Sequence, residues 1–431
     1  MRILRFRLSS NNIREPQGHA MEQWEAELVE KVRTLAQETF TARAEHYDRE
    51  GSFPHENIAD LQQLGIPGMA LPTSVGGLGI GAEAHIRIIE EIAYGDPSTA
   101  VALNMHLLGA ELLSNIPMFA RGQEVVQDVT KNGALLCGPA SVPTGDLDNR
   151  TAGYTIQEDG EDLVINGKSG FASGSDAAKY VIVGGRVPRG EDAEPDLALC
   201  LPEKGTPGLN IMGNWDGMGL RGTASHDIVC EDLRIPRSQA AVIPMAVLRA
   251  VFQAEGGQGG IMQDRARGAL GILAIWLGNA QAAFDFTVDY VGERHGYLAG
   301  PGLSGAVTPG FRSEEGWAQV DIGYMDHWLG TGRVILYDMV RSLDETFPSQ
   351  HEFTRKVTRT VYHLRRMGEE IAVESMKVCG AHAYVKKRPM ERMVRDLIGG
   401  NVMAWKTDQL AMTLGQGALG MPITITGPAG S

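Results

Sequence analysis

The chain has 431 residues, 43% hydrophobic and 21% charged, which is the composition of a globular protein with room for two or three domains. Its formal net charge of −14 argues against broad binding to nucleic acid or to anionic membranes, and no apolar run reaches the ~20 residues of a membrane span. The four cysteines are far apart and lack C-x-x-C spacing, so they indicate neither a zinc site nor a disulfide framework. We expect a cytoplasmic protein with buried thiols.

The N-terminal third of the chain has a helical pattern. Residues 1–21 contain arginine and serine without the apolar segment of a secretory signal, and we expect a disordered lead-in there. Residues 22–132 repeat apolar side chains at three- and four-residue steps, which predicts a helical domain. Asn57 is the expected N-cap of a helix over 58–64, and Asp96, followed by proline, is the expected start of a helix that runs to about residue 113.

The pattern changes to a period of two between residues 133 and 243. Short β-rich runs alternate with glycine, proline and aspartate, which predicts a central antiparallel barrel or sandwich. Asn166-Gly167 has the composition of a turn in this region.

Residues 244–431 return to a helical pattern. Helices are expected at 269–294, 315–343 and 357–378, and from Pro389 onward. The first of these contains Gly271 and Gly278, which allow close helix packing. The glycine- and proline-rich segment 296–314 predicts a long loop.

Several motifs occur in one order along the chain. They are LxxLGxxGxxxP at 61–72, GGLG at 76–79, GDPS at 95–98, FASG at 171–174, WxGMGxRGTxS at 215–225 and PMERMVRD at 389–396. In this order and spacing the chain resembles the acyl-CoA dehydrogenase superfamily. The resemblance implies an α+β fold with a helical domain (22–132), a β domain (133–243) and a C-terminal domain with a four-helix bundle (244–431). It also implies FAD, or FMN in some branches, and a homotetramer or homodimer.

The same resemblance implies contacts with the cofactor and the substrate. Phe171 and Ser173 stand where an aromatic and a hydroxyl flank the flavin ring, with Ser173 placed to donate to the N5 edge. Arg294 stands where an arginine of an adjacent subunit meets the FAD pyrophosphate. The other implied flavin positions are Lys377, Gly380 and Lys406, and the implied substrate loop at 139–146 contains Pro139, Ser141 and Gly145. Packing or surface charge is the alternative for each.

The base of the family reaction is missing from the sequence. Dehydrogenation of a thioester requires a partly desolvated carboxylate that removes the Cα proton while a hydride leaves Cβ for flavin N5. The family places a glutamate eight residues after the aspartate of Arg-Asp, and counting from Asp396 reaches Ala404. A second position used by some relatives corresponds to Gly268. Asp408 and Asp264 are the nearest substitutes, and each is also explained as a helix cap or a surface charge.

Three functions therefore follow from the resemblance. The first is FAD-dependent oxidation of an acyl-CoA or acyl-carrier thioester, with electron-transfer flavoprotein as partner. The second resembles 4-hydroxyphenylacetate hydroxylase and dibenzothiophene monooxygenase, which lack the glutamate and use O₂ with reduced flavin from a separate reductase. It suits a small organic substrate and is the better explanation of Ala404. His106 and His382 are its candidate site residues, although each is also explained as a core histidine. The third is binding of flavin or thioester without turnover.

Overall fold

The computed structural model describes residues 21–138, 153–190, 193–247, 260–298, 308–344, 347, 349–403 and 406–423. Several predictions lie outside the described residues: the lead-in before Met21, the substrate positions Pro139, Ser141 and Gly145, Ala404, and the side chain of Asp264.

The N-terminal part of the protein is helical. Its helices are α1 (Gln23–Leu35), α2 (Thr41–Glu50), α3 (His55–Gln63), α4 (Ala82–Gly95), α5 (Pro97–Ser114) and α6 (Ala120–Asn132). The Asp96 carboxylate accepts hydrogen bonds from the backbone N–H groups of Ser98 and Thr99, which confirms it as the N-cap of α5.

The predicted role of Asn57 is wrong. Helix α3 begins at His55, after Pro54, so Asn57 lies within its first turn. The buried Asn57 side chain donates to Thr99 Oγ1 (3.0 Å) and accepts from Arg43 Nη1 (3.0 Å). Tertiary partners therefore use the amide that would otherwise cap the helix.

The central part is a mixed sheet. Its strands are β2 (Tyr154–Asp159), β3 (Asp162–Ala172), β5 (Val183–Val187), β6 (Asp196–Cys200), β7 (Leu209–Ile211), β8 (His226–Pro236) and β9 (Ala240–Pro244). They are ordered β7-β8-β3-β2-β5-β6-β9. The prediction of a purely antiparallel arrangement is wrong at two places. β2 and β5 pair in parallel, and so do the short strands β1 (Leu136–Cys137) and β4 (Tyr180–Val181).

Asn166-Gly167 is not a turn, which corrects a second prediction. Both residues lie inside β3, where the pairing with β8 is irregular between Ile165 and Gly167. Gly167 has φ +129°, and a Cβ there would lie 2.0 Å from Gly153 O, so the bulge requires glycine.

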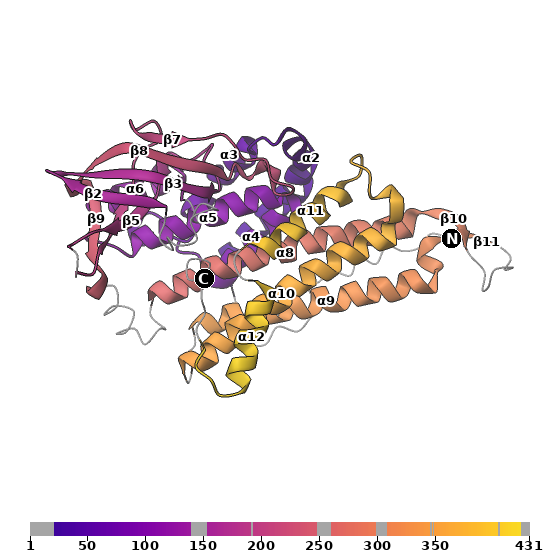
Figure 1. Ribbon diagram of the computed structural model, residues 1–431. Coiled ribbons are helices and arrows are strands. Elements are labelled where there is room, and N and C mark those ends of the chain that lie inside the picture. The colour runs from indigo at the N-terminus through magenta and orange to yellow at the C-terminus, as the bar shows by residue number, and fades with distance from the viewer. Residues whose placement is uncertain are drawn as a thin grey trace.

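The C-terminal helices extend away from the sheet (Figure 1). They are α8 (Gly260–Glu293), α9 (Gly316–Arg341), α10 (Gln350–Cys379), α11 (Pro389–Val402) and α12 (Thr407–Ala418). The first three run side by side, and α10 also packs against α11 and α12. Segment 267–293 of α8 has the length and hydropathy of a membrane span, but 67% of its most apolar window is buried inside the protein, as in a core helix.

A hairpin occupies part of the segment predicted as a loop. Strands β10 (His295–Leu298) and β11 (Thr308–Phe311) pair in antiparallel register, so the prediction for 296–314 is wrong at both of its ends. Figure 1 places this hairpin at the end of the bundle remote from the sheet.

Helix α8 joins the two helical domains. It packs along α4, and buried side chains of both helices belong to one hydrophobic core. The close approach depends on the small residues predicted from the sequence. A Cβ at Gly278 would lie only 2.1 Å from the backbone oxygen of Glu90.

Candidate functional site

The segment 215–225, which we call the junction loop, is fixed at the edge of the sheet. Backbone N–H of Trp215 donates to His226 Nδ1 (2.9 Å), and His226 Nε2 lies 3.2 Å from an Asp176 oxygen. Because Nδ1 accepts a hydrogen bond, the neutral imidazole carries its proton on Nε2, the nitrogen that faces Asp176. Leu220 and Ala224 have φ +52° and +44°, a conformation that is strained for residues other than glycine. Such strain is common at functional sites.

Phe171 presents an exposed ring beside the junction loop. It follows the last regular pairs of β3, has φ +61° and remains 49% exposed. Its ring lies edge-on to Trp215, with 5.9 Å between the centroids. An exposed aromatic held in a left-handed conformation is suited to packing against a planar ligand.

Three hydroxyl groups form a chain behind Phe171. Ser173 Oγ lies 2.8 Å from Ser225 Oγ, which in turn lies 2.7 Å from Thr223 Oγ1. Thr223 Oγ1 donates to the carbonyl oxygen of Leu220 at 2.9 Å. All three hydroxyl residues are buried, and backbone N–H of Gly174 donates to Thr223 O (2.8 Å), which ties the two segments together.

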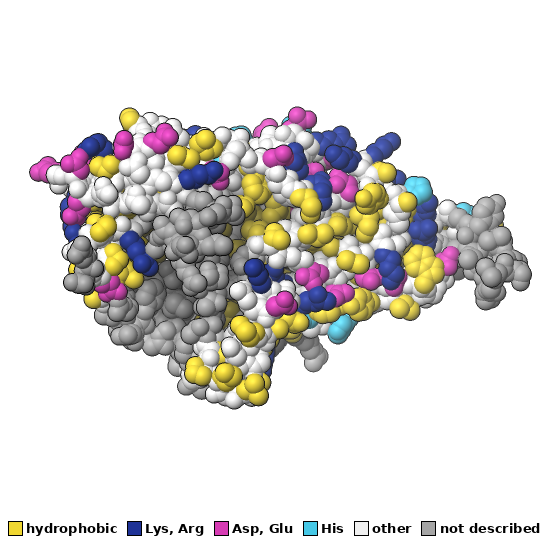
Figure 2. Space-filling view, viewed as in Figure 1, with side chains coloured by type: hydrophobic (Ala, Val, Ile, Leu, Met, Phe, Trp, Pro, Cys, Tyr) yellow, Lys and Arg dark blue, Asp and Glu magenta, His cyan; other side chains and the backbone are white. Residues whose placement is uncertain are grey.

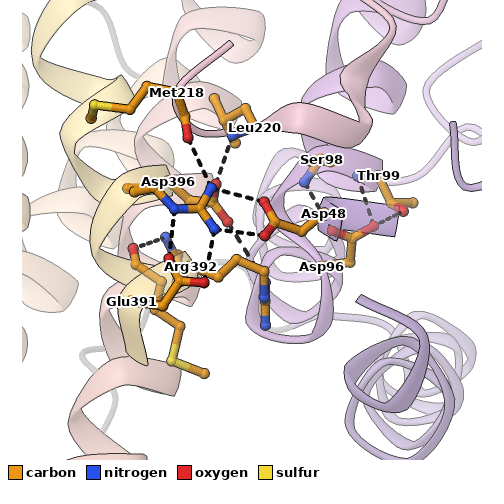
Figure 3. Close-up of polar contacts among 12 residues, drawn as sticks. Asp48, Asp96, Ser98, Thr99, Met218, Leu220, Glu391, Arg392 and Asp396 are labelled. Atoms are coloured by element: carbon orange, nitrogen blue, oxygen red, sulfur yellow. Dashed lines mark hydrogen bonds and ion pairs between the residues drawn. The ribbon is translucent and has the colours of Figure 1, made fainter. Parts of the chain in front are cut away.

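Side chains of helix α11 connect the junction loop to the N-terminal domain through hydrogen bonds and ion pairs (Figure 3). The Arg395 guanidinium binds both carboxylate oxygens of Asp48 (2.9 and 2.6 Å), donates to Met218 O (2.8 Å) and pairs with Glu391 (2.8 Å). Asp48 belongs to α2 and Met218 to the loop, so one side chain connects three parts of the fold. A bidentate pair of this kind fixes orientation as well as distance.

Asp396 supports the same junction from the next position. Its buried carboxylate accepts from Leu220 N (2.6 Å) and lies 3.6 Å from Arg392 Nη1. Burial raises the pKa of Asp396 to about 7, against the opposing effect of Arg392. The carboxylate thus fixes the residue whose carbonyl ends the hydroxyl chain.

A second group of polar residues lies at the far end of the bundle. Arg294 Nη1 donates to the hydroxyl of Tyr290 (2.7 Å), and its Nη2 lies 3.4 Å from His382 Nδ1. Gly380, at φ +67°, has open space around the position of a Cβ. Lys377 Nζ is paired with Glu374 (2.8 Å) and Asp321 (3.1 Å), which raise its pKa.

Comparison with known proteins gives the family. Residues 22–117 match the acyl-CoA dehydrogenase N-terminal domain and residues 270–402 match the acyl-CoA dehydrogenase C-terminal domain, together more than half of the chain. The chain belongs to the acyl-CoA dehydrogenase family.

Relatives of this family member include enzymes of two kinds. The short-chain specific acyl-CoA dehydrogenase of rat mitochondria is 25% identical, over 88% of this chain and 85% of the relative. FMN-bound TdsC, a dibenzothiophene monooxygenase from Paenibacillus sp. A11-2, has a TM-score of 0.80 at 18% identity and covers 92% of this chain and 98% of its own. A glutaryl-coenzyme A dehydrogenase has a TM-score of 0.76 at 20% identity, over 96% and 98%. The two structures show the shared fold. As a member of the acyl-CoA dehydrogenase family, the chain is a flavin-dependent oxidoreductase.

The structure separates the residues that the sequence assigned to flavin into two groups. Phe171 and Ser173 lie at the junction loop, whereas Arg294 directly precedes strand β10 of the hairpin and contacts His382, two residues after Gly380. Lys406 is exposed immediately before α12, and Lys377 is already neutralised by carboxylates of its own chain. The role of Arg294 in a neighbouring subunit stays a prediction.

The two histidine candidates do not meet at the junction loop. His106 Nδ1 accepts from Leu136 N (3.0 Å), so its Nε2–H donates to Pro67 O (3.0 Å), and burial lowers its pKa to about 4. Both ring nitrogens are used by the backbone, which gives His106 a structural role. His382 is exposed and lies with Arg294 at the bundle end.

Among the candidate base positions that the structure describes with their side chains, Gly268 and Asp408, neither holds a buried carboxylate. Gly268 in α8 is buried, and a Cβ there would lie 2.5 Å from Leu108 Cδ1. Asp408 is exposed in the first turn of α12, where its charge stabilises the positive end of the helix dipole. The structure thus favours the helix-terminal explanation of Asp408.

Sequence reasoning missed Asp48, Thr223 and Ser225 as site residues. Thr223 and Ser225 belong to the quoted junction motif, but Thr223 ends a short 3-10 turn and Ala224 is left-handed, so strand periodicity does not predict that their hydroxyls meet. The motif itself was the usable signal. Asp48 gave none, because its partner Arg395 is 347 residues away.

Proposed function

We propose that this protein oxygenates a small organic substrate with O₂ and reduced flavin delivered by a separate reductase. The observation that carries the proposal is the lack of a carboxylate at both family positions for the base: residue 404 is alanine and residue 268 is glycine. The exposed place of Asp408 adds support, because a base that removes a Cα proton must be partly desolvated. Oxygenation requires no such base.

The residues around the junction loop fit a flavin ring. Phe171 offers a flat apolar surface, and the buried hydroxyl of Ser173 offers one polar contact at its side. Reduced flavin, when bound, supplies two electrons, so that reduced flavin, O₂ and substrate give oxidised flavin, oxygenated substrate and water. The protein itself would orient the ring, hold the Ser173 hydroxyl in one orientation and exclude bulk water by means of the packed junction loop.

Dehydrogenation of an acyl thioester is the second candidate. It is favoured by relatedness along the sequence, because the rat short-chain enzyme aligns with 88% of the chain. Acyl-CoA or an acyl carrier would then be the substrate, with electron-transfer flavoprotein as acceptor. A binding protein without turnover remains the third candidate, and the same experiment separates all three.

The test is a pair of anaerobic and aerobic measurements on the flavin-loaded protein. We expect no bleaching of the flavin absorption by a panel of acyl-CoAs, and we expect oxygen-dependent product from small aromatic substrates when a reductase supplies reduced flavin. Bleaching by any acyl-CoA without O₂ would move the protein to the dehydrogenases. The variant Ala404→Glu is the matched control for thioester access, since bleaching only after this substitution means that the thioester enters and lacks its base.

We propose FAD as the flavin, with FMN as the alternative, because the Arg294 guanidinium contacts His382, two residues after Gly380, where the space around a Cβ position is open. Arg294→Ala is expected to weaken FAD binding about tenfold, the loss of one charged hydrogen bond, and to leave FMN binding unchanged. Lys377→Ala is the control, because that ammonium group is already paired. Equal FAD affinity in wild type and Arg294→Ala, measured by equilibrium dialysis, would contradict the assignment.

Assembly into a homotetramer, or alternatively a homodimer, belongs to the same proposal. Figure 2 shows hydrophobic side chains spread over one face of the C-terminal helices. Independently of that view, the exposed apolar residues of these helices include Val320, Val334, Val373, Val402 and Met412. A neighbouring copy would cover this surface and bring its Arg294 to the flavin. A monomeric mass of the purified protein by light scattering would count against the assembly.

A further inference from the structure

The direction of the hydroxyl chain at the junction loop is fixed by its last member. A carbonyl oxygen has no proton, so in the contact between Thr223 Oγ1 and Leu220 O (2.9 Å) only the threonine can donate. In the opposite direction the two oxygens would face each other at this distance without a proton between them, which is repulsive. Leu220 O is itself held in place, because Trp215 Nε1 also donates to it (3.0 Å).

The remaining protons follow one by one. Thr223 has one hydroxyl proton and gives it to Leu220, so it accepts from Ser225 at 2.7 Å. Ser225 has then given its proton away and accepts from Ser173 at 2.8 Å. The proton of Ser173 therefore points back into the protein, and its oxygen has only lone pairs left for a ligand.

We propose that Thr223 and Ser225 are positioning residues that make Ser173 a hydrogen-bond acceptor, selecting the reduced form of flavin over the oxidised form. Reduced flavin carries a proton on N5 and donates there, whereas N5 of oxidised flavin is an acceptor that two lone pairs would repel. The inference rests on the proposed function, which places Ser173 beside the ring. It reverses the donor role that the sequence assigned to Ser173.

The surrounding backbone keeps the chain in this state. Leu220 is held in its left-handed conformation by the bond from its N–H to Asp396, and Gly174 N binds Thr223 O. Of the described non-glycine residues, those with positive φ are Phe171, Leu220, Ala224 and Asp232, and the first three flank the hydroxyl chain. This concentration of strain is what a preorganised ligand contact would require.

The selection suits a protein that receives its flavin from a reductase. Reduced flavin would be retained while it reacts, and the oxidised product would leave more easily. Selection by one hydrogen bond amounts to about threefold to tenfold in the ratio of dissociation constants, and tenfold corresponds to about 30 mV for a two-electron couple.

The experiment measures dissociation constants of the protein for reduced and oxidised FAD, and likewise for FMN, under anaerobic conditions by fluorescence and equilibrium dialysis. We expect the wild type to bind the reduced form more tightly. Ser225→Ala and Thr223→Val free the hydroxyl proton of Ser173 to turn toward the ligand. Each is expected to lower the ratio of the dissociation constant for oxidised flavin to that for reduced flavin about threefold to tenfold. Ser175→Ala is the matched control, because its buried hydroxyl donates to Ala224 O (2.7 Å) outside the chain of three.

The outcomes are distinct. An unchanged ratio in both Ser225→Ala and Thr223→Val, with normal thermal unfolding, overturns the inference. A changed ratio in Ser173→Ala alone also overturns it, since Ser173 would then touch flavin without being set by its neighbours. The binding measurement contains neither substrate nor O₂. If the protein binds reduced flavin more tightly but yields no oxygenated product in the separate activity assay, only the proposed function is overturned. Failure to bind either flavin overturns both.

Discussion

Gly278→Ala is expected to lower the free energy of unfolding by about 3 kcal/mol, the upper range for overpacking. The added methyl group would lie 2.1 Å from Glu90 O and 3.0 Å from Tyr94 N, and both are backbone atoms of α4. Because the contacting atoms are backbone, no side chain can rotate away, and α8 must move from α4. The two helical domains share this contact, so their packing would loosen together.

The measurement is chemical unfolding followed by circular dichroism. Gly292→Ala in the last turn of the same helix is the matched control, because nothing lies within 4 Å of its Cβ position. There the alanine is expected to be neutral or to stabilise by up to about 1 kcal/mol through helix propensity. Equal midpoints for Gly278→Ala and wild type would mean that the crossing of α4 and α8 is wider than described.

Arg395→Ala is expected to cost about 3 kcal/mol. The substitution removes the bidentate pair with Asp48, whose side chain is only 12% exposed, and the bond to Met218 O. It leaves a carboxylate largely withdrawn from water without its cation, and breaking such a pair costs about 3–5 kcal/mol when burial is complete. We take the lower end, since the arginine side chain is 21% exposed.

Two variants make this result specific. Arg49→Ala removes an exposed pair with Glu45 in the same helix as Asp48, and the expected change is at most about 0.5 kcal/mol. Arg395→Lys keeps the charge but loses the planar fork, so an intermediate loss is expected. If Arg395→Ala unfolded at the same urea concentration as Arg49→Ala, the junction would not depend on this ion pair.

The junction also explains how stability and function are connected in this fold. Arg395 and Asp396 are consecutive on α11, and they hold Met218 and Leu220 of the junction loop. A Cβ at Gly219, between those two residues, would lie 2.4 Å from Arg395 O. The loop that carries Thr223 and Ser225 is therefore pressed against the helix, and loosening this contact is expected to disturb the hydroxyl chain as well.

Much of the architecture was readable from the sequence alone. Helical periodicity, the Asp96 cap and the proline at the start of α11 depend on neighbours within a few residues, and the structure confirms them. The family motifs likewise gave the fold and the flavin class. The alanine at position 404 was as plain in the sequence as it could be in any structure, because it concerns the identity of one residue.

Other features depended on partners that are distant in the chain. The Asn57 side chain, predicted to cap a helix, instead donates to Thr99. Asn166-Gly167, predicted as a turn, lies in a bulged strand where Gly153 O approaches Gly167 closely. Ser173 and Ser225 are 52 residues apart, and only their packing reveals the hydrogen bond that turns the proton of Ser173 inward. Periodicity and capping are local and are written in the sequence, whereas the donor or acceptor role of a hydroxyl depends on which atoms the tertiary structure places around it.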